Sequence, residues 1–271
     1  HAVIGDKATD AVGRGLSKLG MPMWSSAFPL AYYPHAIKTQ PSELKVVYFP
    51  SCINQTMGKS KGQSTPLIDK MVALMEKAGY EVIFPKNMKN LCCGTIWESK
   101  GMPDIADRKA KELDDALFEA SDGGRYPVLC DQSPCLHRMR NTIKRVKLYE
   151  PVEFIYEYLA PHLRFVQTDE PVALHFTCST RHMNLNDMFV ALAGMCTTKV
   201  VVPEEVGCCG FAGDKGFTDP EVNRYALRKL RKQLEASGVK RGFSNSRTCE
   251  IGLTVNGGVP YQSIAYLVDE C

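Results

Sequence analysis

Eleven cysteines are the residues of this 271-residue chain that offer the most chemistry. Two pairs are adjacent, Cys92-Cys93 and Cys208-Cys209, and each pair is followed directly by glycine. Adjacent cysteines rarely bond to each other, because the ring that they would close strains the peptide between them. A chain of this length also has enough core residues to fold without a disulfide scaffold. The cysteines therefore favour a reducing compartment and a role in metal binding or redox chemistry.

The sequence repeats itself, and the repeat sorts the cysteines. An apolar run that ends at a cysteine occurs at 46–52 and again at 172–178. Each copy then has a second apolar run, a Cys-Cys-Gly turn and a further cysteine. Aligning the copies gives two sets of four thiols, which are the predicted metal ligands: Cys52, Cys92, Cys93 and Cys135, and Cys178, Cys208, Cys209 and Cys249.

Four thiolates from three loops suit either an iron–sulfur cluster or zinc. Two adjacent side chains reach a broad, polynuclear centre more easily than a single ion, which favours the cluster and leaves zinc as the alternative. Gly94 and Gly210 are predicted cofactor-binding positions, where the backbone approaches the cluster and donates amide hydrogen bonds. Arg247, two residues before Cys249, is predicted to offset the negative charge of the cluster. Five other cationic residues near the cysteines either offset the charge of the cluster in the same way or are ordinary solvated charges. They are His137, Arg138, Arg140, Arg181 and His182.

Three cysteines fall outside the aligned sets. Cys130 aligns with Ser244 and is either a core thiol or a fifth ligand. Cys196 lies in an apolar stretch and is predicted to be a buried structural thiol, and Cys271 has no predicted role. The second copy also has a glycine-rich segment, 207–216, whose backbone amides can wrap an anionic centre. We therefore predict that the second set forms the better cluster site.

Strands and helices alternate between these landmarks. Runs that are apolar at successive positions predict buried strands at 45–49, 81–84, 126–129, 172–176 and 199–202. Helices are predicted from Pro66 to the residue before Gly79, over 104–120 and over 219–236. This alternation predicts an α/β fold of two pseudo-symmetric repeats, each a small, mostly parallel sheet flanked by helices. Ligands bind at the carboxyl ends of such strands, where the first cysteine of each copy and both Cys-Cys-Gly turns fall.

The predicted domains are a connector over 1–40, a first cysteine-rich repeat over 41–165 and a second over 166–271. The connector contains apolar, proline-rich stretches at 21–24 and 29–34 and is expected to pack on a neighbouring upstream domain. The first residue is not methionine, which predicts a piece of a longer protein, and the start lacks the pattern of a signal peptide. The net charge of +3 is too small and too evenly spread to favour nucleic acid binding. No apolar run approaches the roughly 20 residues that a membrane-spanning helix needs.

The duplicated Cys…Cys-Cys-Gly…Cys pattern over 45–271 resembles the cysteine-rich CCG domains of heterodisulfide reductase and of the glycolate oxidase iron–sulfur subunit. The segments 48–54, 204–214 and 246–252 also resemble the C-terminal part of D-lactate dehydrogenases that contain FAD and iron–sulfur clusters. The heterodisulfide reductase type ends each copy with Cys-x-x-Cys, whereas Arg138 and Gly252 stand at that last position here. The resemblance therefore implies a four-thiol cluster of the 4Fe-4S type, in one copy or in both, rather than the five-thiol cluster of that enzyme.

The resemblance implies an electron-transfer module. Electrons from a 2-hydroxy acid such as D-lactate, oxidised at FAD, would pass through a cluster in this chain toward a quinone or cytochrome. The implied partners are upstream FAD and ferredoxin-like domains and that acceptor, in the cytoplasm or at the inner face of the membrane. No catalytic base or nucleophile constellation is evident, so this chain alone is not expected to oxidise a substrate. Two alternatives remain, which are a zinc-stabilised assembly domain and thiol–disulfide chemistry at the adjacent pairs.

Overall fold

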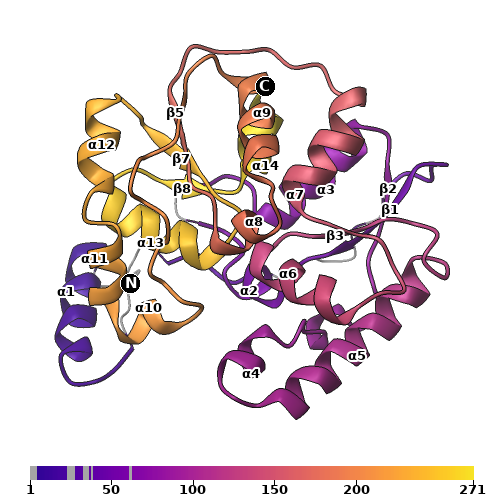
Figure 1. The fold of residues 1–271 in the computed structure, drawn as a ribbon, viewed down its shortest axis with the longest axis horizontal. Coiled ribbons are helices and arrows are strands. Elements are labelled where there is room, and N and C mark those ends of the chain that lie inside the picture. Colours follow the sequence, from indigo (N-terminus) through magenta and orange to yellow (C-terminus); the bar gives the residue numbers. More distant parts are fainter. Residues whose placement is uncertain (1–4, 23–27, 33–36, 38, 61–62) are drawn as a thin grey trace.

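The computed structural model describes residues 5–22, 28–32, 37, 39–60 and 63–271. It contains two four-stranded sheets in which neighbouring strands pair in parallel (Figure 1). The strand order is β2-β1-β3-β4 in the first sheet and β6-β5-β7-β8 in the second. Because the two orders correspond strand by strand, the sheets are two copies of one unit, and the predicted α/β fold of two pseudo-symmetric repeats is confirmed.

The strands are short and lie close to the predicted runs. They are β1 (Lys45–Phe49), β2 (Glu81–Ile83), β3 (Val128–Cys130), β4 (Leu148–Tyr149), β5 (Val172–Leu174), β6 (Val200–Val201), β7 (Arg241–Phe243) and β8 (Tyr261–Gln262). The sequence pattern misses β4, β7 and β8. No continuous apolar run surrounds β4 or β8, and β7 begins with arginine and glycine.

Helices follow most strands. In the first repeat these are α2 (Cys52–Thr56), α3 (Leu67–Lys77), η1 (Met88–Asn90), α4 (Thr95–Ser99), α5 (Pro103–Ala120), α6 (Ser133–Thr142), α7 (Pro151–Phe154), the π-helical turn η2 (Ile155–Leu159) and η3 (Ala160–His162). In the second they are α8 (Cys178–His182), α9 (Asn186–Cys196), α10 (Lys215–Thr218), α11 (Pro220–Ala226), α12 (Leu230–Ala236), α13 (Arg247–Gly257) and α14 (Ile264–Glu270).

Two of the three predicted helices match the structure, and the third does not. Helices α3 and α5 begin and end within about a residue of prediction. The continuous helix predicted over 219–236 is wrong, because α11 ends at Ala226 and α12 begins at Leu230. Leu227, in the break, is buried in the core of the second repeat, so the turn lets both short helices pack on that core.

The amino-terminal segment contains a helix that the sequence pattern does not predict, α1 (Asp6–Ser17). Farther along, the backbone of Leu30 pairs with that of Lys59, and Phe28 packs edge-on against Phe217 of the second repeat. The described part of the connector thus packs on both repeats, and its packing on an upstream domain stays a prediction. The residues 23–24 and 33–34 of its two proline-rich stretches lie outside the described residues.

A shared core joins the repeats. Helices α3, α7, α9 and α14 lie between the two sheets (Figure 1), and their apolar side chains form one buried cluster with those of β1 and β5. Helix α14 of the second repeat packs on α3 of the first, where Asp269 pairs with both Lys70 and Lys77. Two smaller cores cover the opposite sheet faces, one under α5 and α6 and one under α12 and α13. In the part of the chain that the structure describes, no helix is long and apolar enough to cross a membrane.

Candidate functional site

The four aligned thiols of the first repeat lie together at the carboxyl edge of its sheet. Cys52 is the first residue of α2, Cys135 is in the first turn of α6, and Cys92-Cys93 lie between β2 and α4. The thiols interact in a row, with Cys52 next to Cys92, and Cys93 next to both Cys92 and Cys135. Three loops that are far apart in the sequence therefore bring four sulfurs together, and we name them the first thiol row.

The second repeat builds an equivalent row from the aligned cysteines. Cys178 is the first residue of α8 and interacts with Cys208, and the Sγ atoms of Cys209 and Cys249 are 2.9 Å apart. We name these four the second thiol row. The contacts within each row run from one thiol to the next. Among the described residues, no three or more His, Cys, Asp or Glu side chains are arranged around a single metal-ion position.

Capped helices set the first cysteine of each row. The Ser51 hydroxyl accepts a hydrogen bond from the amide of Asn54, and the Thr177 hydroxyl accepts one from Thr180, so α2 and α8 begin at their cysteines. Asp131 fixes the first of these loops, because its carboxylate accepts hydrogen bonds from the Ser51 amide at 2.8 Å and from the Tyr48 hydroxyl. Cys52 and Cys178 are consequently held in place while remaining exposed.

Both predicted glycines adopt the left-handed conformation, with φ of 87° at Gly94 and 71° at Gly210. The amide of each donates to the sulfur of the first cysteine in its own pair, at 3.4 Å and 3.3 Å. A side chain at Gly94 would overlap the carbonyl oxygen of Ala106 in α5, and one at Gly210 would lie 2.7 Å from the Ala226 side chain in α11. Glycine is therefore required for the backbone conformation and for close packing of a helix against the turn.

Each row contains one thiol that is readily ionised. Hydrogen bonding with Cys178, and with Cys209, lowers the pKa of Cys208 to about 2. Hydrogen bonding with Cys52 and with Cys93 does the same for Cys92, whose pKa is also lowered to about 2. The thiolate is the form that binds soft metals. The first cysteine of each Cys-Cys-Gly turn is thus prepared for ligation in the same way in both repeats.

Arg247 is fully buried between the repeats. Its guanidinium donates to Asn54 of α2 at 3.1 Å, to Ser60 at 3.1 Å and to Glu250 at 2.7 Å. The side chain therefore lies between the helix that begins at Cys52 and the helix that carries Cys249. Its predicted action on the charge of a cluster stays a prediction.

The three cysteines outside the rows have different surroundings. Cys130 is fully buried in β3, and its thiol donates to the Gln132 carbonyl at 3.8 Å. It also interacts electrostatically with Cys93 and Cys135 of the first thiol row, so its two predicted roles, core thiol and fifth ligand, stay predictions. Cys196 is fully buried, as predicted for a structural thiol. The sequence does not predict that Cys196 lies beside Cys271, whose Sγ atom is 3.8 Å from the Cys196 carbonyl oxygen.

Several polar residues around the rows have contacts that sequence reasoning missed. Arg138 is buried and pairs with Asp107 at 3.0 Å, so it is not a solvated charge. The rings of His137 and His182, one from each repeat, have centroids 5.7 Å apart. Lys100, after α4, pairs with Asp214 of the glycine-rich segment at 2.7 Å and links the surroundings of the two rows. The only sequence signal for this last contact is the Lys-Gly that follows both Cys-Cys-Gly turns.

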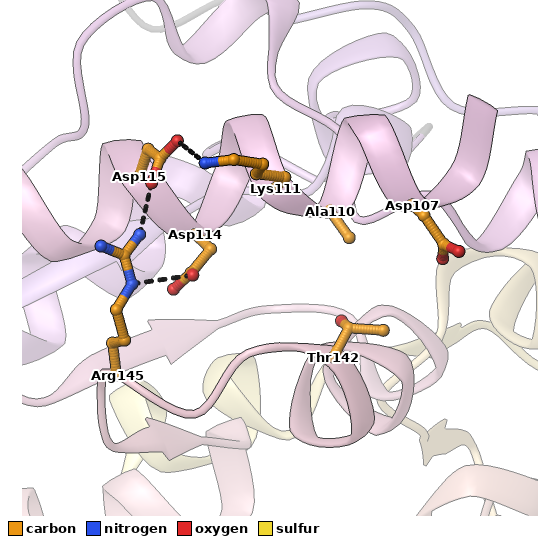
Figure 2. Close-up of a pocket in the computed structure, with 7 residues that line it drawn as sticks. All are labelled: Asp107, Ala110, Lys111, Asp114, Asp115, Thr142 and Arg145. Carbon is orange, nitrogen blue, oxygen red and sulfur yellow. Dashed lines mark hydrogen bonds and ion pairs between the residues drawn. The ribbon is translucent and has the colours of Figure 1, made fainter. Parts of the chain in front are cut away.

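A separate pocket lies between α5 and the end of α6 with the segment that follows it (Figure 2). It is lined by Asp107, Ala110, Lys111, Asp114, Asp115, Thr142 and Arg145. Figure 2 shows that Arg145 bridges Asp114 and Asp115 and that Lys111 also reaches Asp115. These charges neutralise one another, and no cysteine is among the described lining residues. The thiol rows, rather than this pocket, form the candidate site.

Two parallel sheets that each hold a row of four thiols at the carboxyl edge define a duplicated cysteine-rich α/β protein. The model of the CCG cysteine-rich domain family matches residues 46–140 and 172–254, which include all eight aligned cysteines. The chain belongs to this family, and the match to both repeats confirms the duplication that the sequence pattern predicts.

Similar proteins include lactate utilization protein A 1 of Bacillus mycoides (strain KBAB4). It is 22% identical over 248 residues, which cover 84% of this chain and 97% of that protein. Among solved structures, the Picrophilus torridus aspartate racemase is 9% identical and covers 85% of this chain and 94% of its own, with a TM-score of 0.37. An aspartate racemase homologue from Pyrococcus horikoshii OT3 is 14% identical over 83% of this chain and 96% of its own, with a TM-score of 0.34. Similarity at these TM-scores carries no functional argument.

Proposed function

We propose that this chain is an iron–sulfur electron-transfer module of an oxidoreductase system that uses lactate or a related 2-hydroxy acid. The observation that carries the proposal is the pair of thiol rows, because each assembles four soft ligands from three loops at the ligand-binding edge of a parallel sheet. The CCG family match and the similarity to a lactate utilization protein support the same interpretation.

The donor set suits a cluster. All four side chains in each row are thiols, and the first cysteine of each adjacent pair is readily deprotonated. The glycine amide that already donates to that sulfur would hydrogen-bond a ligated thiolate in the same way, and such bonds raise the reduction potential of thiolate-held iron. A bound 4Fe-4S cluster would supply one-electron transfer. The protein residues would ligate it, donate hydrogen bonds to it and exclude water from its buried side.

The rest of the electron path lies outside this chain in the proposal. FAD on another domain or subunit oxidises the 2-hydroxy acid, of which D-lactate is the proposed example. A ferredoxin-like domain passes the electrons to the thiol rows, and a quinone or cytochrome accepts them. We place this system in the cytoplasm, with peripheral contact to the inner face of the membrane where the acceptor is a quinone.

Metal analysis tests the proposal directly. The chain is purified anaerobically and reconstituted with iron and sulfide, and iron, acid-labile sulfide, zinc and visible absorbance are measured. We expect a brown protein whose iron and sulfide fall in Cys92→Ser and in Cys208→Ser, one variant for each row. Cys271→Ser is the control, because it changes a partly exposed thiol outside both rows and should keep the wild-type iron content. A colourless protein with stoichiometric zinc would favour the zinc-stabilised assembly domain and overturn the proposal.

A further inference from the structure

A third pair of thiols lies outside the two rows. Cys196 is the last residue of α9 and is fully buried, whereas Cys271 directly follows α14 and is partly exposed. The two thiols interact with each other, and the Cys271 Sγ atom lies 3.8 Å from the Cys196 carbonyl oxygen. Neither cysteine has a counterpart in the other repeat. The pair is therefore not a third copy of the metal-binding pattern.

Backbone hydrogen bonds hold the two cysteines next to each other. The amide of Val166 donates to the Cys271 carbonyl at 2.7 Å, and the amide of Thr168 donates to the Cys196 carbonyl at 2.9 Å. Both donors belong to the segment that joins the repeats. Helices α9 and α14 also pack together in the shared core, and Figure 1 shows the carboxyl end of the chain beside α9. The proximity of the thiols is thus built into the fold.

We propose that Cys196 and Cys271 form a reversible dithiol–disulfide site that is oxidised by low-molecular-weight disulfides. This inference goes beyond the proposed function and does not depend on it. Cys271, the more accessible thiol, attacks one sulfur of the small disulfide, forms a mixed disulfide and releases one small thiol. Cys196 then attacks the Cys271 sulfur, closes the Cys196–Cys271 bond and releases the second small thiol. Two protein thiols are oxidised, one small disulfide is reduced to two thiols, and the two protons leave on those thiols.

The electrostatics favour this order of attack. Hydrogen bonding with Cys196, aided by the nearby positive charge of Arg241, lowers the pKa of Cys271, although burial and the negative charge of Glu270 act against it. The thiolate is the nucleophile in disulfide exchange, so the exposed member of the pair is also the more reactive one. Hydrogen bonding with Cys271, together with burial, raises the pKa of Cys196, which keeps it protonated until the mixed disulfide forms.

Oxidation would affect the second repeat most. The bond would join the end of α9 to the end of α14 and close a loop that contains Cys208, Cys209 and Cys249. Closing a long loop restricts the unfolded chain, so the oxidised protein should unfold at a higher temperature than the reduced protein.

Peptide mapping of the full chain under defined glutathione ratios tests the proposal. Anaerobically purified protein is incubated with oxidised glutathione, denatured and alkylated. It is then digested with trypsin, which cleaves after Lys199, and with chymotrypsin, which cleaves after Tyr266. These cleavages separate Cys196 and Cys271 from the other cysteines. We expect a linked Cys196–Cys271 peptide pair that disappears when excess reduced glutathione is added. Cys196→Ser should instead keep one glutathione on Cys271, and Cys130→Ser, a matched buried cysteine, should behave like wild type.

Two results would overturn the proposal. One is wild-type protein in which both cysteines remain alkylated as free thiols. The other is wild-type protein in which Cys271 keeps its glutathione and no internal bond forms. The melting temperature gives an independent readout, since it should rise by several degrees on oxidation of the wild type and not of Cys271→Ser. Cys271 is partly exposed, so this variant should fold even where a change at buried Cys196 does not.

Discussion

The backbone amide of Arg247 donates to the side-chain oxygen of Gln132 at 3.0 Å, which bonds the loop before Cys249 of one repeat to the loop before Cys135 of the other. The two repeats make equivalent contacts across this junction. Ser133 and Arg247 occupy aligned positions, two residues before the last cysteine of each row, and Ser133 lies 3.0 Å from the Thr180 hydroxyl. The Nε atom of Arg247 donates to the side-chain oxygen of Asn54 at 3.1 Å, and Asn54 aligns with Thr180. Each repeat thus supports the cysteine-bearing loops of the other, and the two rows form one structural unit.

The first prediction concerns this junction. Arg247→Met keeps the length of the side chain but leaves the side-chain amide oxygen of Asn54 and the Glu250 carboxylate without their buried donor. Breaking a buried ion pair on one side costs about 3–5 kcal/mol, so the free energy of unfolding in a denaturant titration should fall by about that amount. The control is Arg125→Met, which removes an exposed ion pair with Asp122 and should cost less than about 1 kcal/mol. Equal stability of the two variants would show that Arg247 does not hold the repeats together.

The second prediction concerns pH. Burial, and then the positive charge of Arg181, lowers the pKa of His175 from 6.5 to about 4. The unfolded chain therefore binds a proton on His175 between pH 6.5 and pH 4 that the folded chain does not, so the contribution of His175 to stability should fall as the pH falls through this window. Buried Glu150 and Glu250, whose pKa values burial raises to about 7, act in the opposite direction, so the His175 contribution is the difference between the wild type and a His175 variant. The full effect is about 3 kcal/mol, and it should be absent above pH 6.5. Denaturant titrations at several pH values measure it.

Variants separate this effect from other acid-sensitive groups. His175→Gln should lower stability at neutral pH, and the difference in stability between the wild type and this variant should shrink by about 3 kcal/mol between pH 6.5 and pH 4. His162→Gln changes an exposed histidine and should leave the wild-type slope in place. A His175→Gln slope identical to that of wild type would assign the acid sensitivity to another group.

The third prediction separates backbone strain from close packing at the Cys-Cys-Gly turn. Gly94→Ala introduces a methyl group against the Ala106 carbonyl at a φ of 87°, whereas Gly101→Ala meets nothing within 4 Å at a φ of 74°. Gly101→Ala should cost about 1 kcal/mol of stability from strain alone. Gly94→Ala should cost about 1–3 kcal/mol more, because α5 must shift. Reconstituted iron content should fall in Gly94→Ala and not in Gly101→Ala. Equal losses in both would mean that the turn needs only its backbone conformation.

The sequence allows the fold class, the repeat and the assembly of the thiols to be predicted, because apolar runs mark strands and cysteines follow those strands directly. Strands β4, β7 and β8 leave no such signal, because no continuous apolar run surrounds them. Arginine is usually exposed, so the sequence does not indicate that Arg247 is buried. Tertiary packing places its side chain between Asn54 and Glu250. The contact between Cys196 and Cys271 likewise arises from the packing of α14 on α9, which no local pattern encodes. The domain boundaries at 40 and 165 and the role of the eight thiols as ligands stay predictions.

The last prediction concerns the direction of electron flow and the unequal surroundings of the two rows. The Cys208-Cys209 pair of the second row lies within the glycine-rich segment 207–216, and Asp214 of this segment pairs with Lys100 of the first repeat. The Cys92-Cys93-Gly94 turn of the first row is followed by the bulkier helix α4, in which Ile96 and Trp97 are partly exposed.

If the second row is the one that delivers electrons, Cys208→Ser in the complete oxidoreductase should reduce electron transfer to the external acceptor to the background rate. Reduction of the flavin by substrate, followed by stopped-flow absorbance, should stay close to wild type, because in the proposed electron path that step precedes the cluster. Cys271→Ser is the control, since it changes a partly exposed thiol outside both rows and should preserve both steps. Retained acceptor reduction in Cys208→Ser, combined with its loss in Cys92→Ser, would assign electron delivery to the first row. Loss of flavin reduction in a folded Cys208→Ser protein would contradict the electron-transfer role itself.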